Sequence, residues 1–407
     1  MANNVWDIKT NFRVEYFTGP GGVWSAIQAD SYQVDIDRGI TVEESVFARP
    51  DVGIATVQLM KSSLSALVSG SPYAPNQPFR ISYQPLPDTS PSTWEIIFYG
   101  FIQNVGMSYN VEAKKLGITI VANDAVKILL NTQLSSFSVI GSFAARSFRN
   151  VMSNATAPNN LNYAINAVDS RITLAQNGSG ASNTTQWAWT WLDTPSGEII
   201  NQFLDAELGW AYASKDSSTC YYYSRTDLDT LQAKTWNTSN PTVSNIHTSS
   251  ILHYCMDYLD LSYDCDTMVN KARAIETTAP SIIKNATNSS SVTAYGEQRS
   301  SFEVTFDTTS GSALSTLQQW VSAVVASAAD PKSIRQVSCP ALRRDGTVSD
   351  IAKLDVGQTL QVEFSDGTNV IRYPDATAGN KALIVSRINH SISADHWEMT
   401  VGLWKGI

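Results

Sequence analysis

The residue types best suited to hold a metal gather in one stretch, which contains His247, His253, Cys255 and Cys265. Imidazole and thiolate groups are the ligands that zinc prefers in proteins. However, the stretch has no Cys-x-x-Cys pair, and its His-x-Cys spacing differs from the common structural zinc patterns. We therefore interpret these four as ordinary strand or loop residues, and a metal site is the alternative.

Carboxylates follow in the same region, at Asp257, Asp260, Asp264 and Asp266. Such a cluster could bind calcium, or two of its members could act as acid and base. The stretch lacks the glycine and the terminal glutamate of an EF-hand loop. We interpret it as a solvated acidic face, and calcium binding is the alternative.

Two further pairs of residues could transfer protons. Asp205 and Glu207 lie two positions apart in a predicted helix, so their side chains do not face each other. His390 and His396 flank a predicted turn, but no nucleophile is identifiable near them. We predict that both histidines lie at strand ends on the surface.

Three tryptophans, Trp187, Trp189 and Trp191, alternate along one segment and would share one face of a strand. Such a face could bind a glycan, whereas packing against a helix or a neighbouring subunit is the interpretation we prefer. The glycine pair Gly178-Ser-Gly180 lies in a Ser/Asn-rich stretch and is interpreted as a flexible loop rather than a phosphate site.

No established catalytic motif occurs in a suitable context. We therefore predict no catalytic, cofactor-binding or metal-binding residues and no enzymatic activity. The chain has 407 residues, 16% of them charged, and a net charge of −9. This balance argues against a nucleic-acid clamp and against attachment to anionic lipid. No window approaches 18 consecutive apolar residues, so we expect no membrane insertion.

Short strands dominate the first 130 or so residues. Alternation of apolar and polar side chains predicts them at 12–17, 54–60, 79–83, 94–102 and 116–121. The segment 94–102 is apolar on both faces, so we expect it to lie centrally in its sheet. Asn123 and Asp124 can cap a following helix.

The middle of the chain indicates an α+β region. A helical pattern covers 143–152, and Thr194 and Pro195 predict the start of a second helix, with Thr as its cap and Pro in its first turn. Gly209 is expected to end that helix. The segment 210–225 is typical of a hairpin that turns at 215–218.

The last part, from about residue 240, is again rich in strands and contains one long helix at 312–330. Strands are predicted at 359–364, 381–388 and 396–404, with a turn at Asp366-Gly367 after the first of them. The stretch 283–300 has few apolar residues, and we expect it to be a mobile loop. The predicted fold class is mainly β with an α+β middle.

Taken in order, these segments resemble the tail hub, or minor tail, proteins of long-tailed bacteriophages, which include baseplate hubs. The first part of the resemblance rests on VDIDRGITVEESVFARPDVGIATVQLM (34–60), PFRISY (78–83), IIFYGFI (96–102) and LGITIVANDAVKILL (116–130). The middle part rests on the helix and hairpin at 195–225. The last part rests on 314–339, LDVGQTLQVEF (354–364) and VSRINHSISADHWEMTVGL (385–403). The stretch 283–300 departs from the family pattern.

The resemblance implies two tail-tube-like antiparallel β-barrel hub domains and a mixed α/β domain. We expect the first barrel at 1–133, an α+β peripheral domain at 134–238, and the second barrel, with the long helix 312–330, at 239–407. Three chains would then present six barrels around one axis. The resemblance also implies a siphovirus tail tip in the virion, and the N-terminus MANNVWDIKT lacks a leader pattern, so we expect synthesis in the bacterial host cytoplasm.

The partners implied by the resemblance are those of a hub. They are two further copies of the chain in a homotrimer, the distal tail protein or tail tube ring, the C-terminus of the tape-measure protein, and tip fibre or spike proteins. DNA would pass through during ejection without specific binding, because an acidic lumen repels its phosphates. The alternatives are a hexameric distal tail ring protein and a glycan-binding or cell-wall-degrading tip protein.

Overall fold

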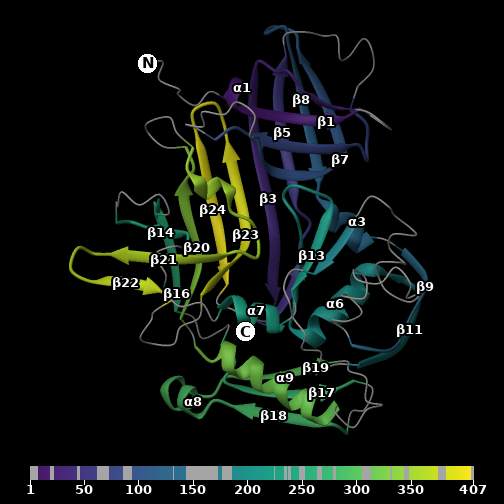
Figure 1. Cartoon of the computed structure of the whole chain (residues 1–407), viewed down its shortest axis with the longest axis vertical. Helices are drawn as coiled ribbons and strands as arrows, with labels where there is room; N and C mark the ends of the chain where they lie inside the picture. The colour runs from purple at the N-terminus through teal and green to yellow at the C-terminus, as the bar shows by residue number, and fades with distance from the viewer. Residues whose placement is uncertain are drawn as a thin grey trace.

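The chain is mainly β, and one sheet dominates it (Figure 1). A computed structural model describes residues 8–18, 23–43, 46–61, 73–85, 94–131, 133–143, 173–176, 186–223, 225–232, 236, 240–246, 253–263, 268–277, 281–304, 313–330, 332–342, 348–374 and 382–404. The predicted fold class, mainly β with helices in the middle and one long helix near the end, is confirmed.

The dominant sheet has 16 strands, drawn from both ends of the chain. Its N-terminal strands are β1 (Phe12–Phe17), β2 (Trp24–Ala26), β3 (Ser31–Glu43), β4 (Phe47–Pro50), β5 (Ile54–Lys61), β6 (Pro78–Tyr83), β7 (Glu95–Asn110) and β8 (Lys115–Asn123). Its C-terminal strands are β14 (Thr242–Ser244), β15 (His253–Cys255), β16 (Tyr258–Tyr263), β20 (Lys332–Pro340), β21 (Thr359–Ser365), β22 (Val370–Tyr373), β23 (Leu383–Ile392) and β24 (Trp397–Trp404).

The two sets of strands meet at one seam, where β3 pairs antiparallel with β23. Gly39 lies opposite Arg387 in this pairing and has a φ of +153°, a conformation that favours glycine. A Cβ atom at position 39 would lie 2.3 Å from the carbonyl oxygen of Ser386. The seam therefore depends on the absence of a side chain at this position.

Alternation along the strands decides which face of the sheet is buried, as the sequence predicts. On β5, Ala55, Val57 and Leu59 are buried, whereas Gln58 and Met60 on the other face are exposed. The same rule holds on β6 and β24. β7 continues to Asn110, beyond the predicted end at residue 102, because its far half pairs with β8 as a projecting hairpin.

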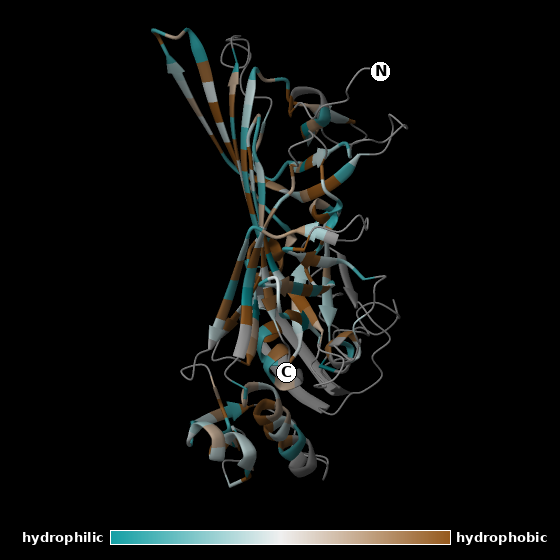
Figure 2. Ribbon diagram, turned by 90° about the vertical axis from the view of Figure 1, so that its left-hand side faces the viewer, coloured by the Kyte–Doolittle hydropathy of each residue, from teal (hydrophilic) through white to brown (hydrophobic). Residues whose placement is uncertain are grey.

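The described helices and strands of the middle of the chain lie on one side of the large sheet, which Figure 2 shows nearly edge-on. It contains a three-stranded sheet, a two-stranded sheet and short helices. These elements are β9 (Gln133–Phe143), β10 (Thr173–Gln176), β11 (Gln186–Pro195), β12 (Trp210–Ala213), β13 (Thr219–Tyr223), α3 (Ala125–Asn131), α6 (Ser196–Glu207) and α7 (Arg225–Gln232). A short helix, α1 (Ile8–Asn11), precedes β1.

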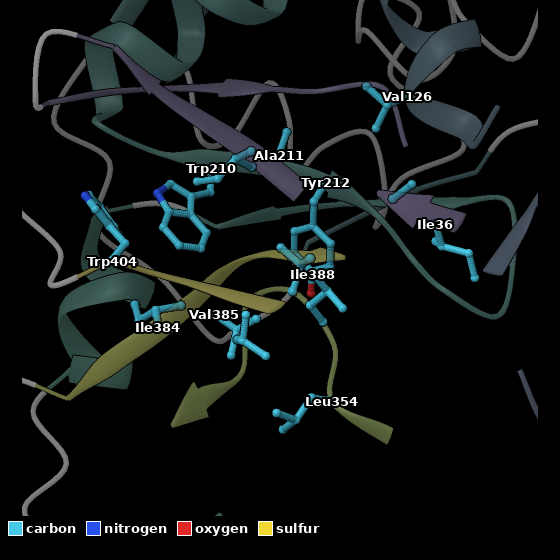
Figure 3. Close-up of a cluster of buried hydrophobic side chains, with 14 of the residues drawn as sticks. Ile36, Val126, Trp210, Ala211, Tyr212, Leu354, Ile384, Val385, Ile388 and Trp404 are labelled. Atoms are coloured by element: carbon cyan, nitrogen blue, oxygen red, sulfur yellow. The ribbon is translucent and has the colours of Figure 1, made fainter. Parts of the chain in front are cut away.

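A shared apolar core lies behind the seam and holds the middle of the chain to the sheet. Figure 3 shows Trp210 of β12 and Trp404 of β24 among aliphatic side chains of β23, and the two indole ring centroids are 4.6 Å apart. Trp210 and Ile388 are essentially inaccessible to solvent. Burial of such large side chains contributes roughly 1.5–3 kcal/mol each.

The helix ends show which local signals were correct. The Asp124 carboxylate accepts a hydrogen bond from the Val126 amide at 3.0 Å, so the predicted cap before α3 is confirmed. At α6 the capping residue is Pro195 and makes no side-chain hydrogen bond, so the predicted Thr194 cap is wrong by one position. Leu208, not Gly209, takes the left-handed conformation that ends this helix.

The stretch 283–300, expected to be a mobile loop, instead forms regular structure. It contains β18 (Ile283–Thr287), α8 (Ser289–Tyr295) and the start of β19 (Arg299–Val304), and both strands pair with β17 (Lys271–Glu276). Buried polar groups replace the missing apolar ones: the amide Nδ2 of Asn270 donates to Ser291 Oγ at 3.2 Å and to the Gly296 carbonyl at 2.7 Å. The composition of 283–300 does not predict this network, because its hydrogen bonds join residues that are far apart in the sequence.

The structure also bears on three further predictions from the sequence. The long helix is α9 (Ala313–Ala328), as predicted. The turn at Asp366-Gly367 leads into β22 rather than into the strand after it. Phe143 lies in β9, so a helix starting there is wrong, and residues 144–152 lie outside the described residues. A 3-10 helix, η1 (Asp350–Lys353), precedes β21.

Replacing Gly39 with alanine is expected to destabilise the fold by about 2–4 kcal/mol, because the new methyl group would overlap the Ser386 carbonyl. The control is Gly106→Ala, where the nearest atom to an added Cβ is 3.9 Å away. Denaturant unfolding of both variants measures the difference. Equal midpoints for the two would show that the seam is not packed as described.

Candidate functional site

The feature of the fold with the clearest functional character is a polar wall, formed by eight neighbouring strands of the large sheet. Their order is β16-β20-β24-β23-β3-β5-β8-β7, and every neighbouring pair is antiparallel. One face of these strands carries the buried apolar side chains. The opposite face carries Asp260, Gln336, Glu398, Thr400, Asn389, Ser391, Gln33, Asp35, Asp37, Thr56, Gln58, Thr119, Asn104 and Ser108, together with the exposed apolar side chains of Ile54, Met60 and Tyr258.

Hydrogen bonds link side chains of the wall on neighbouring strands. Ser391 Oγ donates to the Asp35 carboxylate at 3.0 Å, which links β23 to β3. Arg387 Nε donates to Asp37 at 2.7 Å, and a second guanidinium nitrogen reaches Asp51 at 3.3 Å. These carboxylates raise the pKa of Arg387. The wall is thus a network of short polar groups on a rigid sheet.

The charge on the wall is slightly negative. Its strand positions carry the carboxylates Asp35, Asp37, Asp260 and Glu398. Against these stand Arg387 at the seam, the exposed Arg335 at the register shift between β20 and β16, and Lys115 at the free end of the β7–β8 hairpin. The Arg387 guanidinium is already paired with carboxylates. A polyanion would therefore find few cations on this surface to neutralise its charge.

Directly behind the wall, a second set of charges is buried. Arg38 is 4% exposed and pairs with the Asp355 carboxylate. Burial raises the pKa of Asp124 to about 7, although Arg38 opposes this shift. Lys215 donates to the Lys353 carbonyl, and burial lowers its pKa. These groups fix β3, the β12–β13 hairpin and η1 to one another.

His390 belongs to this buried set, so the prediction that it lies at a strand end on the surface is wrong. Its Nδ1 accepts a hydrogen bond from the Trp397 indole at 3.2 Å. Burial, with Arg38 and Lys215 nearby, lowers the pKa of His390 to about 3. His396 is exposed, with its Nε2 3.5 Å from a Glu398 oxygen. The two histidines point to different environments and form no proton relay.

The structure does not assemble the metal site considered from the sequence. His253 and Cys255 begin and end β15, and Cys255 is exposed. His247 and Cys265 lie outside the described residues. Within the ranges that the structure describes, no three His, Cys, Asp or Glu residues are grouped so that they could hold a metal ion.

The structure places two residues of the acidic stretch and one of the Asp205/Glu207 pair. Asp257 is exposed just before β16 and Asp260 lies on the wall, whereas Asp264 and Asp266 lie outside the described residues. Asp205 forms a bidentate pair with Arg49 of β4, and its carbonyl accepts from the Trp320 indole at 2.9 Å. Asp205 therefore links α6 to β4 and to α9. The side chain of Glu207 lies outside the described part of the structure.

The tryptophan segment forms β11, which pairs antiparallel with β9 and has a register shift between Trp187 and Trp189. The side chains of Trp187, Trp189 and Trp191 lie outside the described part of the structure, so glycan binding there stays a prediction. Gly178 and Gly180 also lie outside it. Sequence reasoning missed the wall as a unit, because its members come from separate segments that only the sheet register brings together.

Comparisons with known proteins show which solved structures have a similar fold. No protein-family model matches this chain, and no curated protein matches it. Among solved structures, a tail protein from Neisseria meningitidis MC58 is similar with a TM-score of 0.58, 10% identity, and coverage of 97% of this chain and 96% of that one. The 43 kDa tail protein of prophage MuSo2 from Shewanella oneidensis follows with 0.56, 9% identity, and coverage of 97% and 98%.

A third similar structure is the prophage tail protein gp18 from Listeria monocytogenes EGD-e, with a TM-score of 0.51, 10% identity, and coverage of 96% and 94%. At these identities the likeness concerns the fold. The fold is that of phage tail proteins over nearly the whole chain, so the resemblance indicated by the sequence is confirmed at this level. No described helix is long and apolar enough to cross a membrane.

Acid should destabilise the protein partly through His390. Its folded pKa of about 3 lies below the unfolded value near 6.5, so the unfolded state binds more protons between these pH values and stability falls as pH falls through them. Asp124 acts with the opposite sign, because its pKa is raised. In His390→Gln, whose amide oxygen can still accept from Trp397, the loss between pH 7 and 4.5 should shrink by about 2–3 kcal/mol.

Urea unfolding at the two pH values measures this, and His396→Gln is the matched control because His396 is exposed. The control should lose stability as the unmodified protein does. If His390→Gln also follows the unmodified protein, the buried neutral histidine is not a source of acid sensitivity.

Proposed function

We propose that this protein is a structural, non-enzymatic component of a bacteriophage tail tip. In this proposal it forms a homotrimeric hub that joins the distal tail protein or tube ring to tip fibres or a spike, and it lines part of the DNA ejection channel. The observation that carries the proposal is the polar wall, a continuous antiparallel sheet with one solvent-facing face that is mostly polar and slightly negative. The tail-protein fold supports it.

The wall consists of two similar units. At the seam it divides into β3-β5-β8-β7 and β23-β24-β20-β16, each with four antiparallel strands. In each unit a long strand also enters a second layer: β7 pairs with β6, and β23 pairs with β21. This correspondence supports two barrel-type domains at 1–133 and 239–407, with a peripheral α+β domain at 134–238.

Two units per chain favour three copies around the axis. Three eight-stranded walls would give a ring of twenty-four strands containing six units, which could dock on a sixfold ring above it. A hexameric distal tail ring, the alternative in the same class, would need one unit per chain. The two units therefore favour the hub over the distal ring.

The chemistry of the wall suits a channel for DNA. DNA binds proteins mainly through cations that neutralise its phosphates. The wall presents mostly carboxylates, amides and hydroxyls instead, and Arg387, its cation at the seam, is paired with Asp37. In the proposed ring, DNA and the C-terminus of the tape-measure protein would occupy this lumen without specific binding of the DNA. The protein would reside in the virion tail tip after synthesis in the host cytoplasm.

Native mass spectrometry of the purified protein is expected to give a species of three times 44.4 kDa. We expect a trimer because each wall has unpaired strand edges, with which strands of neighbouring copies can pair. A dilution series tests whether the species is specific. A persistent monomer, or a hexamer, would contradict the hub and would leave only the fold likeness standing.

Reversing a charge on the wall is expected to slow DNA ejection. Asp35→Lys changes the net charge by +2 per chain, +6 per trimer, where DNA would pass, and should lower the ejection rate by roughly threefold or more at low salt. The control Glu303→Lys makes the same change on β19, at an exposed position away from the wall. Fluorescence of released DNA from assembled virions measures the rate. Equal rates for both variants would count against a lumenal wall.

A further inference from the structure

A second layer of strands lies behind the wall, and one face of this layer is turned outward. The layer consists of β2, β1, β6 and the first part of β7, and β1 crosses the long wall strands in Figure 1. Its inward face packs on the apolar side of the wall, where the ring of Phe12 contacts Tyr32 of β3 and the ring of Tyr83 contacts Trp397 of β24. The opposite face therefore points away from the wall.

Two tryptophan–arginine stacks lie on this outward face. The guanidinium carbon of Arg80 is 4.3 Å from the centroid of the Trp24 ring, and that of Arg13 is 3.7 Å from the centroid of the Trp94 ring. Arg13 lies opposite Ser82 on the paired strands β1 and β6, so Arg80 is its diagonal neighbour, with Cβ atoms roughly 7–8 Å apart. The two stacks are therefore close together, and cation–π attraction holds each indole in place.

The indole of Trp24 extends across the layer. β2 and β7 are separated by β1 and β6, a backbone distance of about 14 Å, yet the ring centroids of Trp24 and Tyr99 are 6.0 Å apart. Glu15 on the same face is only 5% exposed and accepts a hydrogen bond from Arg80 Nε at 2.7 Å. Because the Arg80 guanidinium covers one face of the half-buried indole, the other face is the one that a ligand can reach.

Hydrogen-bond donors at the rim of this platform have no partner in the part of the chain that the structure describes. They are the indole N–H of Trp24, the hydroxyl of Tyr99 and the terminal nitrogens of Arg80. The charge of Arg80 is balanced by Glu15, whereas Arg13 is exposed and has no ion pair among the described residues. The platform is thus apolar at its centre, rich in donors at its rim, and positively charged on one side.

These properties favour a sugar over a peptide. A flat indole can cover the apolar face of a sugar ring, and the rim donors can bind its hydroxyl and ring oxygens. A peptide would also bring amide N–H groups that need acceptors, but the carboxylate of this surface, Glu15, is buried and already bonded. The unpaired guanidinium of Arg13 suits a carboxylate or phosphate group on the ligand.

We propose that the outward face around Trp24 and Trp94 binds an anionic glycan, a polysaccharide that carries carboxylate or phosphate groups. Trp24 stacks on a sugar ring, Tyr99 and Arg80 donate to its oxygens, and Arg13 pairs with the anionic group. This inference goes beyond the proposed function, because it gives the outward surface a role in binding a polymer outside the tail. It needs one chain only and does not depend on the trimer.

Calorimetric titration of the purified chain tests the site, with three polymers as probes at about 0.15 M salt. Polygalacturonate supplies carboxylates, poly(glycerol phosphate) supplies phosphates, and dextran is neutral. At least one anionic polymer should bind, and dextran should bind at least tenfold more weakly. Comparison of the two anionic polymers shows which anionic group the site prefers. Absence of binding to both would overturn the proposal and leave this surface to a protein partner.

Substitutions show whether binding occurs at the platform. Trp24→Ala should weaken binding at least tenfold, and Arg13→Gln, at an exposed position, at least fivefold without a change in the unfolding midpoint. The matched controls are Tyr295→Ala, an exposed aromatic residue on α8, and Arg273→Gln, an exposed arginine on β17, which should leave binding unchanged. Binding that the two control substitutions weaken as much as Trp24→Ala and Arg13→Gln do would be non-specific and would overturn the assignment.

Discussion

The structure depends on the antiparallel pairing of β3 with β23, two strands about 350 residues apart in the chain. The close approach at Gly39 turns two sheets into one, because a side chain there would collide with the Ser386 carbonyl. Pairing strands so distant in sequence carries a loop-closure cost, which is met by burying large apolar surfaces on one face only. The other face is thereby left free, continuous and polar.

Behind the seam, buried charges act together with the apolar core to set the relative position of the parts. The Arg38–Asp355 pair and the Lys215–Lys353 carbonyl contact are largely buried, and removing one partner of such a pair leaves a costly unpaired charge. This arrangement specifies geometry more than it adds stability. A wall whose strands must meet those of another copy needs such fixed geometry, since a one-residue slip would exchange its faces.

Much of the fold could be predicted from local patterns, whereas the wall could not. Alternation identified β1, β5, β6 and β24 nearly residue for residue, because one face of each is buried. Local composition failed at 283–300, where Asn270 supplies hydrogen bonds from a different segment. It also placed His390 on the surface, because nothing near it in sequence shows that Trp397 covers it. Residues such as Asp35 and Glu398 share a face through strand register, which the sequence alone does not specify.

The central claim is that each chain contributes two four-stranded units to one continuous wall, and that three chains complete the ring. The most direct measurement is an electron-microscopy reconstruction of the assembled tail tip without imposed symmetry. The account predicts six four-stranded units, related in pairs by a threefold axis, with their polar face toward the lumen. A ring with a different number of chains, or a map in which the polar face of the wall points away from the axis, would contradict it.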